Sequence, residues 1–162
     1  MSYVRARKLT LDEVIPEIVQ SSRQHKSLTF ICPEFRGRKI TVHLSSSRIR
    51  LMGRTQVCSA CQAKGDHFWV ESNSKNKNRQ PCGWHLNLYA LNHYGHPVLM
   101  TLDAHNGSRS KSGTKAIDNI QLLCTACNNA KEDKPLSIRD VAIKISEKDP
   151  ILRQLLEDAG II

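Results

Sequence analysis

Apolar residues recur every three or four positions near the N-terminus, and this spacing predicts an amphipathic helix over residues 11–22. Thr10 and Glu13 form a capping box at its start, since each side chain can bond the other residue's backbone N–H. Pro16 lies inside this segment, so it either kinks the helix or marks a later start.

Runs rich in β-branched and aromatic residues predict short strands separated by turn residues. The predicted strands cover residues 27–32, 39–44, 68–71, 85–91, 98–103 and 120–124. The first two form a hairpin across the turn at 33–38, and residues 92–95 supply a second turn. Residues 72–80 are polar, Asn-rich and basic, which is typical of an exposed loop that either touches phosphates or is simply solvated.

Capping and stop signals predict four further helices. A short basic helix over residues 45–52 would end at Gly53, and another begins at Cys127 and ends at Lys134-Pro135. The last two helices are marked by their caps, Ser137 with Asp140 for one and Asp149-Pro150 with the stop residue Gly160 for the other.

With 162 residues and 40% hydrophobic content, the chain can bury one core but hardly two. We expect an α+β protein in which residues 58–136 form the core. Residues 1–57 would add a basic helix and hairpin, and residues 137–162 the C-terminal helices. No run of about 18 apolar residues and no signal-like start occurs, so we expect a soluble, cytoplasmic protein without a membrane partner.

A net charge of +9 and a pI near 9.5 suggest a polyanionic partner. Residues 1–57 hold eleven Lys/Arg against four Asp/Glu, residues 58–136 nine against six, and residues 137–162 four against five. The positive field is therefore predicted over the N-terminal and central parts. The alternative is a well-solvated surface without such a partner.

Six cysteines without a secretion signal argue against a disulfide framework. Four of them form two Cys-x-x-Cys pairs about sixty residues apart, and two such pairs can enclose one tetrahedral zinc ion. These four are Cys58, Cys61, Cys124 and Cys127. Coincidental core thiols or redox dithiols are the alternative. Cys32 and Cys82 are interpreted as small apolar residues rather than as further ligands.

The segment 98–131 combines an apolar run before Asp103, Asn106-Gly107, a loop that ends in Asp118-Asn119-Ile120, and residues 123–128 with Lys131. In order, spacing and residue type it resembles the HNH endonuclease family, also called ββα-metal nucleases, in its cysteine-containing branch. The resemblance covers about residues 58–131. It implies a zinc-stabilised ββα-metal core and metal-dependent hydrolysis of DNA phosphodiester bonds, by nicking or double-strand cleavage.

The resemblance also implies roles for individual residues. Asp103 and Asn128 would bind one catalytic divalent ion, Asn119 would steady the loop, and a His in the place of Ala104 would be the general base. Phosphodiester hydrolysis needs such a base and a cation. The hard oxygens of Asp103 and Asn128 suit Mg²⁺ or Mn²⁺.

Ala104 departs from the family pattern, because alanine neither accepts a proton nor binds metal. A His-to-Ala substitution that keeps the fold and blocks cleavage is the simplest explanation. His105 could instead be the base after a one-residue shift, or the natural protein could be a pseudo-nuclease. Adjacent side chains on a strand point to opposite faces, so His105 would not face the site that residue 104 faces.

Basic residues on two segments are candidate DNA contacts. They are Arg109, Lys111 and Lys115 on the loop of the HNH segment, and Arg48, Arg50 and Arg54 near the N-terminal basic helix. The predicted partner is double-stranded DNA, and a homodimer would be a natural route to cutting both strands. The compact size and basic N-terminal extension look phage-like. Two alternatives are a non-catalytic zinc-stabilised nucleic-acid-binding module and a structural zinc protein in a larger complex.

Overall fold

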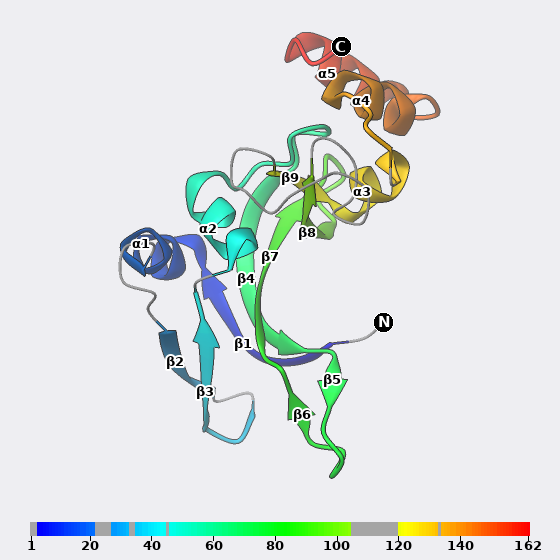
Figure 1. Cartoon of the computed structure of the whole chain (residues 1–162). Helices are drawn as coiled ribbons and strands as arrows, with labels where there is room; N and C mark the ends of the chain where they lie inside the picture. The colour runs from blue at the N-terminus through cyan, green and yellow to red at the C-terminus, as the bar shows by residue number, and fades with distance from the viewer. Residues whose placement is uncertain (1–2, 22–26, 33–34, 45, 105–119, 133) are drawn as a thin grey trace. The chain divides into compact units, whose positions relative to one another are not determined.

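A computed structural model describes residues 3–21, 27–32, 35–44, 46–104, 120–132 and 134–162. Helices and mainly antiparallel strands give the α+β architecture that the sequence predicts (Figure 1). The chain divides into two compact units. The first contains Met1–Arg54 and Asp66–Tyr89, and the second contains Thr55–Gly65 and Ala90–Ile162.

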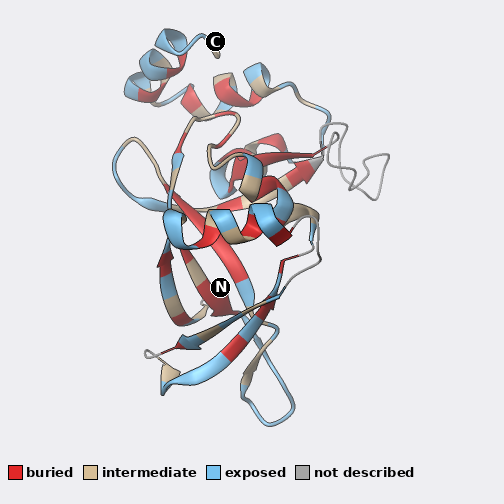
Figure 2. Cartoon of the chain, turned by 90° about the vertical axis from the view of Figure 1, so that its left-hand side faces the viewer, coloured by how far each residue is buried: buried red, intermediate tan, exposed pale blue. Residues whose placement is uncertain are grey.

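The first unit is built on three neighbouring strands in the order β1-β4-β7, where β1 is Val4–Thr10, β4 is Lys64–Ser72 and β7 is His85–Leu91. Strands β4 and β7 are buried along most of their length (Figure 2). The sequence did not predict β1. Its register against β4 shifts between Arg5 and Arg7, so its buried residues, Ala6 and Leu9, are three positions apart and do not alternate.

Helix α1 (Leu11–Ser21) follows β1 directly, and its predicted capping box is confirmed. The Thr10 amide donates to Glu13 Oε2 at 2.8 Å, and the Glu13 amide donates to Thr10 Oγ1 at 3.2 Å. Pro16 lies inside the helix, and Val14 and Ile18 are buried.

Helix α2 (Ser47–Arg54) packs against α1, and the prediction that Gly53 ends this helix is wrong. Gly53 lies within α2, where a Cβ atom would meet Ile18 Cγ2 at 2.7 Å. The missing side chain therefore allows the close approach of α1 and α2. Ile18 has little freedom to yield, because Cγ2 is attached to a branched Cβ that lies 3.6 Å from the same point.

We expect Gly53→Ala to lower the free energy of unfolding by about 1–2 kcal/mol, because the overlap with Ile18 outweighs the better helix propensity of alanine. Chemical denaturation would measure this. Ile18→Ala in the Gly53→Ala background should recover part of the loss, and Arg50→Ala on the exposed side of α2 is the matched control. A more stable Gly53→Ala variant would contradict the close approach.

Two hairpins complete the first unit. Strands β2 (Ser27–Cys32) and β3 (Arg38–His43) pair antiparallel from Ser27↔His43 to Cys32↔Arg38, which confirms the predicted hairpin. Strands β5 (Ser74–Lys75) and β6 (Pro81–Cys82) form a second, short hairpin, where the sequence predicted only an exposed loop. Its tip is nevertheless exposed, as expected.

A polar cluster lies inside the first unit around the fully buried carboxylate of Glu71 on β4. This carboxylate accepts hydrogen bonds from Asn87 Nδ2 at 2.7 Å, from the Tyr89 hydroxyl at 2.5 Å and from Arg5 Nε at 3.2 Å. Burial and the hydrogen bond to Glu71 raise the pKa of Tyr89 to about 12. Each buried polar group of the cluster is thus satisfied internally.

Arg48, a predicted DNA contact, is half-buried and forms hydrogen bonds within the first unit, and its contact with DNA stays a prediction. Its guanidinium donates to Asn87 Oδ1 at 2.6 Å and to the Leu86 carbonyl at 3.4 Å. Burial lowers the pKa of Arg48. The arginine therefore holds α2 to β7 in the first unit, whereas Arg50 and Arg54 are exposed.

The second unit contains the end of β7, then β8 (Pro97–Ala104) and β9 (Ile120–Cys124), in the order β7-β8-β9. Strands β8 and β9 pair antiparallel from Met100↔Cys124 to Ala104↔Ile120. Helix α3 (Thr125–Lys131) follows β9 directly and packs on both strands. It begins two residues earlier than the predicted start at Cys127.

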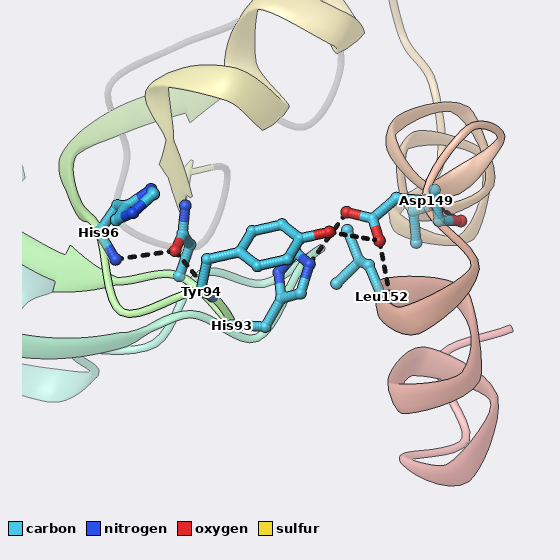
Figure 3. Close-up of polar contacts among 8 residues, drawn as sticks. His93, Tyr94, His96, Asp149 and Leu152 are labelled. Carbon is cyan, nitrogen blue, oxygen red and sulfur yellow. Dashed lines mark hydrogen bonds and ion pairs between the residues drawn. The ribbon is translucent and has the colours of Figure 1, made fainter.

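Helices α4 (Ile138–Ser146) and α5 (Pro150–Asp158) begin at the predicted caps. Asp149 accepts the Leu152 amide at 3.1 Å, and it also lies 2.9 Å from His93 Nε2 and 3.2 Å from the Tyr94 hydroxyl (Figure 3). These contacts, led by the Leu152 amide, lower the pKa of Asp149. They tie the turn after β7 to the start of α5. Among the described helices, none is long and apolar enough to cross a bilayer.

Candidate functional site

Four cysteines of the second unit converge as the spacing predicts. Cys58 and Cys61 lie in a turn before β4, Cys124 ends β9, and Cys127 lies in the first turn of α3. Their four sulfur atoms all lie within 4.8 Å of one another, and the sulfurs of Cys61 and Cys124 are 3.7 Å apart. The cluster is a possible zinc site.

Backbone hydrogen bonds shape the first cysteine pair into a compact knuckle. The Cys58 amide donates to the Ala63 carbonyl at 2.9 Å, and the Gln62 amide donates to the Cys58 carbonyl at 3.0 Å. Gln62 has a φ of 66°, which reverses the chain direction after Cys61. The Ser59 amide donates to the Leu122 carbonyl of β9 at 2.9 Å, and this bond attaches the knuckle to the second cysteine pair.

The donor set of this cluster fits zinc. Four thiolates at Zn–S distances of about 2.3 Å in a tetrahedron have sulfurs roughly 3.8 Å apart, close to the observed 3.7 Å. The Cys124 backbone amide donates to the Cys58 sulfur at 3.3 Å, which stabilises a thiolate at that position.

We expect Cys61→Ser and Cys127→Ser to lose bound zinc and to lower the melting temperature, because binding of a structural metal contributes to folding free energy. Metal analysis of the purified chains and thermal unfolding with and without a chelator would measure both effects. Cys82 lies outside the cluster, so Cys82→Ser is the control and should keep about one zinc per chain. Full zinc content in Cys127→Ser would contradict the assignment.

A second polar group forms around Asp103 near the end of β8. Only 9% of Asp103 is exposed, and its Oδ2 accepts Gln121 Nε2 at 3.0 Å. The fully buried ammonium of Lys131 lies 3.2 Å from the same oxygen and 3.4 Å from Oδ1. Sequence reasoning assigned no contact to Lys131 or Gln121. Their places follow from the packing of α3 and from the β8–β9 register, which puts Gln121 opposite Asp103 and is known only from the structure.

Asn128 on α3 lies on the same side of the β8–β9 hairpin as Asp103. Its Nδ2 donates to Thr101 Oγ1 at 2.8 Å, and that hydroxyl donates to the Leu123 carbonyl at 2.8 Å. Thr101 and Asp103 are two positions apart on β8, so their side chains share one face of the strand. Asp103 and Asn128 therefore approach this face from the strand and from the helix.

Two side chains from this face carry oxygens of the kind that hard divalent cations prefer, the Asp103 carboxylate and the Asn128 carboxamide. Gln121 Oε1 adds a third, because it is buried and makes no hydrogen bond to the described residues. A cation there would share the Asp103 carboxylate with the Lys131 ammonium.

Several predicted site residues cannot be placed. His105, Asn119, Arg109, Lys111 and Lys115 lie outside the described residues. For Ala104 the description is limited to the backbone, which pairs with Ile120 across the β8–β9 ladder.

Residues 80–134 match the model of the HNH endonuclease family. This segment is similar to an HNH endonuclease domain. The match spans β6, β7, β8, β9 and α3, and it includes Asp103, Asn128 and the second cysteine pair, while Cys58 and Cys61 lie before it. No curated protein and no solved structure is significantly similar to the chain. The HNH domain indicates a nuclease, and the cysteine cluster agrees with the cysteine-containing branch.

We expect Lys131→Met to lower the free energy of unfolding by about 3 kcal/mol, because it leaves the Asp103 carboxylate buried without its counter-charge. Equilibrium denaturation would measure the loss. Adding Asp103→Asn to Lys131→Met should recover part of it, because the unpaired charge is then gone. An unchanged stability of Lys131→Met would show that the HNH domain does not depend on this ion pair.

Proposed function

We propose that this chain is a divalent-metal-dependent DNA endonuclease whose present form is impaired at Ala104. The observation that supports it best is the placement of Asp103 and Asn128 on one side of β8, β9 and α3, within the segment that matches the HNH model. A site with these residues would hydrolyse phosphodiester bonds by attack of water.

In the proposed mechanism, Asp103 and Asn128 hold a Mg²⁺ or Mn²⁺ ion through oxygen atoms. The ion would supply the charge that stabilises the phosphate and the leaving oxygen. Lys131 and Gln121 fix the orientation of the Asp103 carboxylate by the contacts described above. The zinc ion proposed for the cysteine cluster has no chemical role and only holds α3 in place.

The general base is the missing part of the proposed site. The HNH pattern has its His where this chain has Ala104, and a methyl group cannot take a proton from water. Asn119 keeps the role that the family pattern implies, as the residue that steadies the loop. His105 is the alternative base, which would require a shift of the pattern by one residue.

A non-catalytic, zinc-stabilised DNA-binding module is the second candidate function. The specific observation in its favour is Ala104 itself. If alanine is the natural residue at this position, the chain lacks the general base and would bind DNA without cutting it. Asp103 would then serve only its ion pair with Lys131.

We expect Ala104→His to nick or linearise supercoiled plasmid with Mg²⁺ or Mn²⁺, about 10²- to 10⁴-fold faster than the parent chain, since this is the usual contribution of a general base. Gel analysis of plasmid forms over time would measure the rates. Ala104→His combined with Asn128→Ala should lose the activity, and combined with His105→Ala it should keep it.

Two other outcomes of this assay would change the assignment. If neither chain cuts with any divalent ion although both bind DNA, the binding module is the better description. If the parent cuts as fast as Ala104→His, His105 is the base, and His105→Ala in the parent should abolish cleavage.

A further inference from the structure

The β5–β6 hairpin of the first unit carries an unusual series of side chains. From the end of β5 to the residue before β6, basic residues alternate with carboxamide residues. The basic residues are Lys75, Lys77 and Arg79, and the carboxamide residues are Asn76, Asn78 and Gln80. All six are exposed. Figure 1 shows this hairpin projecting beyond the ends of β4 and β7.

The tip of the hairpin is ordered by its own backbone and by the side chain of Asn76. Asn76 Oδ1 accepts the amides of Asn78 at 2.9 Å and Gln80 at 3.0 Å. The Asn76 amide donates to the Gln80 carbonyl at 2.9 Å, and the Arg79 amide donates to the Asn76 carbonyl at 2.9 Å. Arg79 has a φ of 59°, a conformation that non-glycine residues seldom adopt. The tip therefore presents its side chains from a defined backbone.

The base of the hairpin is also held in place. Ser72 Oγ donates to the Ser74 carbonyl at 3.1 Å and to the Cys82 carbonyl, and it accepts the Ser74 amide at 3.2 Å. Ser72 is buried. One hydroxyl thus joins both strands of the hairpin to the end of β4.

Charge is distributed unequally between the two units. The first unit holds fourteen Lys/Arg against six Asp/Glu, whereas the second holds ten against nine. No Asp or Glu occurs between Glu71 and Asp103. Within the described part of the chain, Lys75, Lys77 and Arg79 form no ion pair with a carboxylate. A merely solvated surface usually intersperses both signs of charge, and this hairpin does not.

We propose that the β5–β6 hairpin binds duplex DNA, with the side chains of its tip in a groove. A two-stranded ribbon fits the major groove, where Lys and Arg recognise guanine and Asn and Gln recognise adenine. Lys and Arg also neutralise phosphates and release counterions. This inference rests on the proposed function, because it takes DNA as the substrate, and it assigns binding to a hairpin whose three basic residues lie just before the segment that matches the HNH model.

The test compares two variants of the full chain that remove the same charge. Lys75→Gln, Lys77→Gln and Arg79→Gln together form the hairpin variant. Arg139→Gln, Lys148→Gln and Arg153→Gln, on and between α4 and α5, form the control. Binding of a fluorescent DNA duplex is followed by anisotropy over a range of salt concentrations, and thermal unfolding verifies that both variants are folded.

We expect the hairpin variant to bind about ten- to a hundredfold more weakly and to lower the slope of log K against log salt by about two to three, one per lost phosphate contact. The control should stay within about twofold of the parent. A second variant, Asn78→Ala with Gln80→Ala, should keep affinity for mixed sequences and reduce the preference among duplexes selected by the parent. Asn76 is kept in both, because it orders the tip.

Three outcomes would overturn the inference. Equal affinity and slope in the hairpin variant and the parent would remove the hairpin from the DNA contact and leave the proposed function intact. Equal losses of affinity in the hairpin variant and the control would show that the hairpin acts only through the net charge of the protein and makes no specific contact. A parent chain that binds no duplex DNA would overturn both the inference and the proposed function.

Discussion

The convergence of four cysteine sulfurs, all within 4.8 Å of one another, is the constraint on which the arrangement of the second unit depends. The Cys58 and Cys61 knuckle is joined by this cluster to the point where β9 ends and α3 begins. A seven-residue helix has little stability of its own, so its direction depends on what holds its first turn. Cys127 and Lys131 are four positions apart on α3, on the same helix face, and both are fully buried. Fixing Cys127 therefore places Lys131 against Asp103.

The buried carboxylate of Asp103 is balanced by the buried ammonium of Lys131. A buried carboxylate alone would cost several kcal/mol, and the buried ammonium 3.2 Å away offsets that cost. The same ammonium opposes a second cation on the same oxygens. For the divalent ion proposed at Asp103, affinity would depend on how far Asn128 and Gln121 add oxygen ligands against this repulsion. In that proposal, the stability of the fold and the strength of metal binding would be coupled through one carboxylate.

Local signals in the sequence predicted much of this structure, and contacts between distant residues explain most of what they missed. Helix caps and Cys-x-x-Cys pairs involve residues three positions apart, so they can be recognised in the sequence. The caps are Thr10, Ser137 and Asp149. Strand β1 was missed because its register shift breaks the alternation on which strand prediction relies. The role of Gly53 required knowledge of which residue of α1 would face it.

The same limit applies to charged residues. Arg48 and Arg50 look equivalent in the sequence, yet Arg48 donates a hydrogen bond to Asn87 while Arg50 is exposed. They differ because only one side of α2 faces β7 in the first unit. Lys131 and Asp103 are separated by 28 positions, and their pairing follows from the packing of α3 on β8. Sequence reasoning identified Asp103 and Asn128 through a family pattern, and the pattern carries no information on which neighbours orient them.

The proposed metal-dependent cleavage of DNA has two opposing electrostatic requirements, and the unequal charge of the two units bears on both. Association with a polyanion gains from positive charge, through counterion release. A site that must concentrate a divalent cation loses from the same charge, because a positive potential repels the ion. The second unit, which contains Asp103 and Asn128, is close to neutral, with ten basic and nine acidic residues, and most of the positive charge lies in the first unit. In the proposed function, Asp103 would bind a cation in the nearly neutral second unit, while the basic hairpin of the first unit would provide affinity for phosphates.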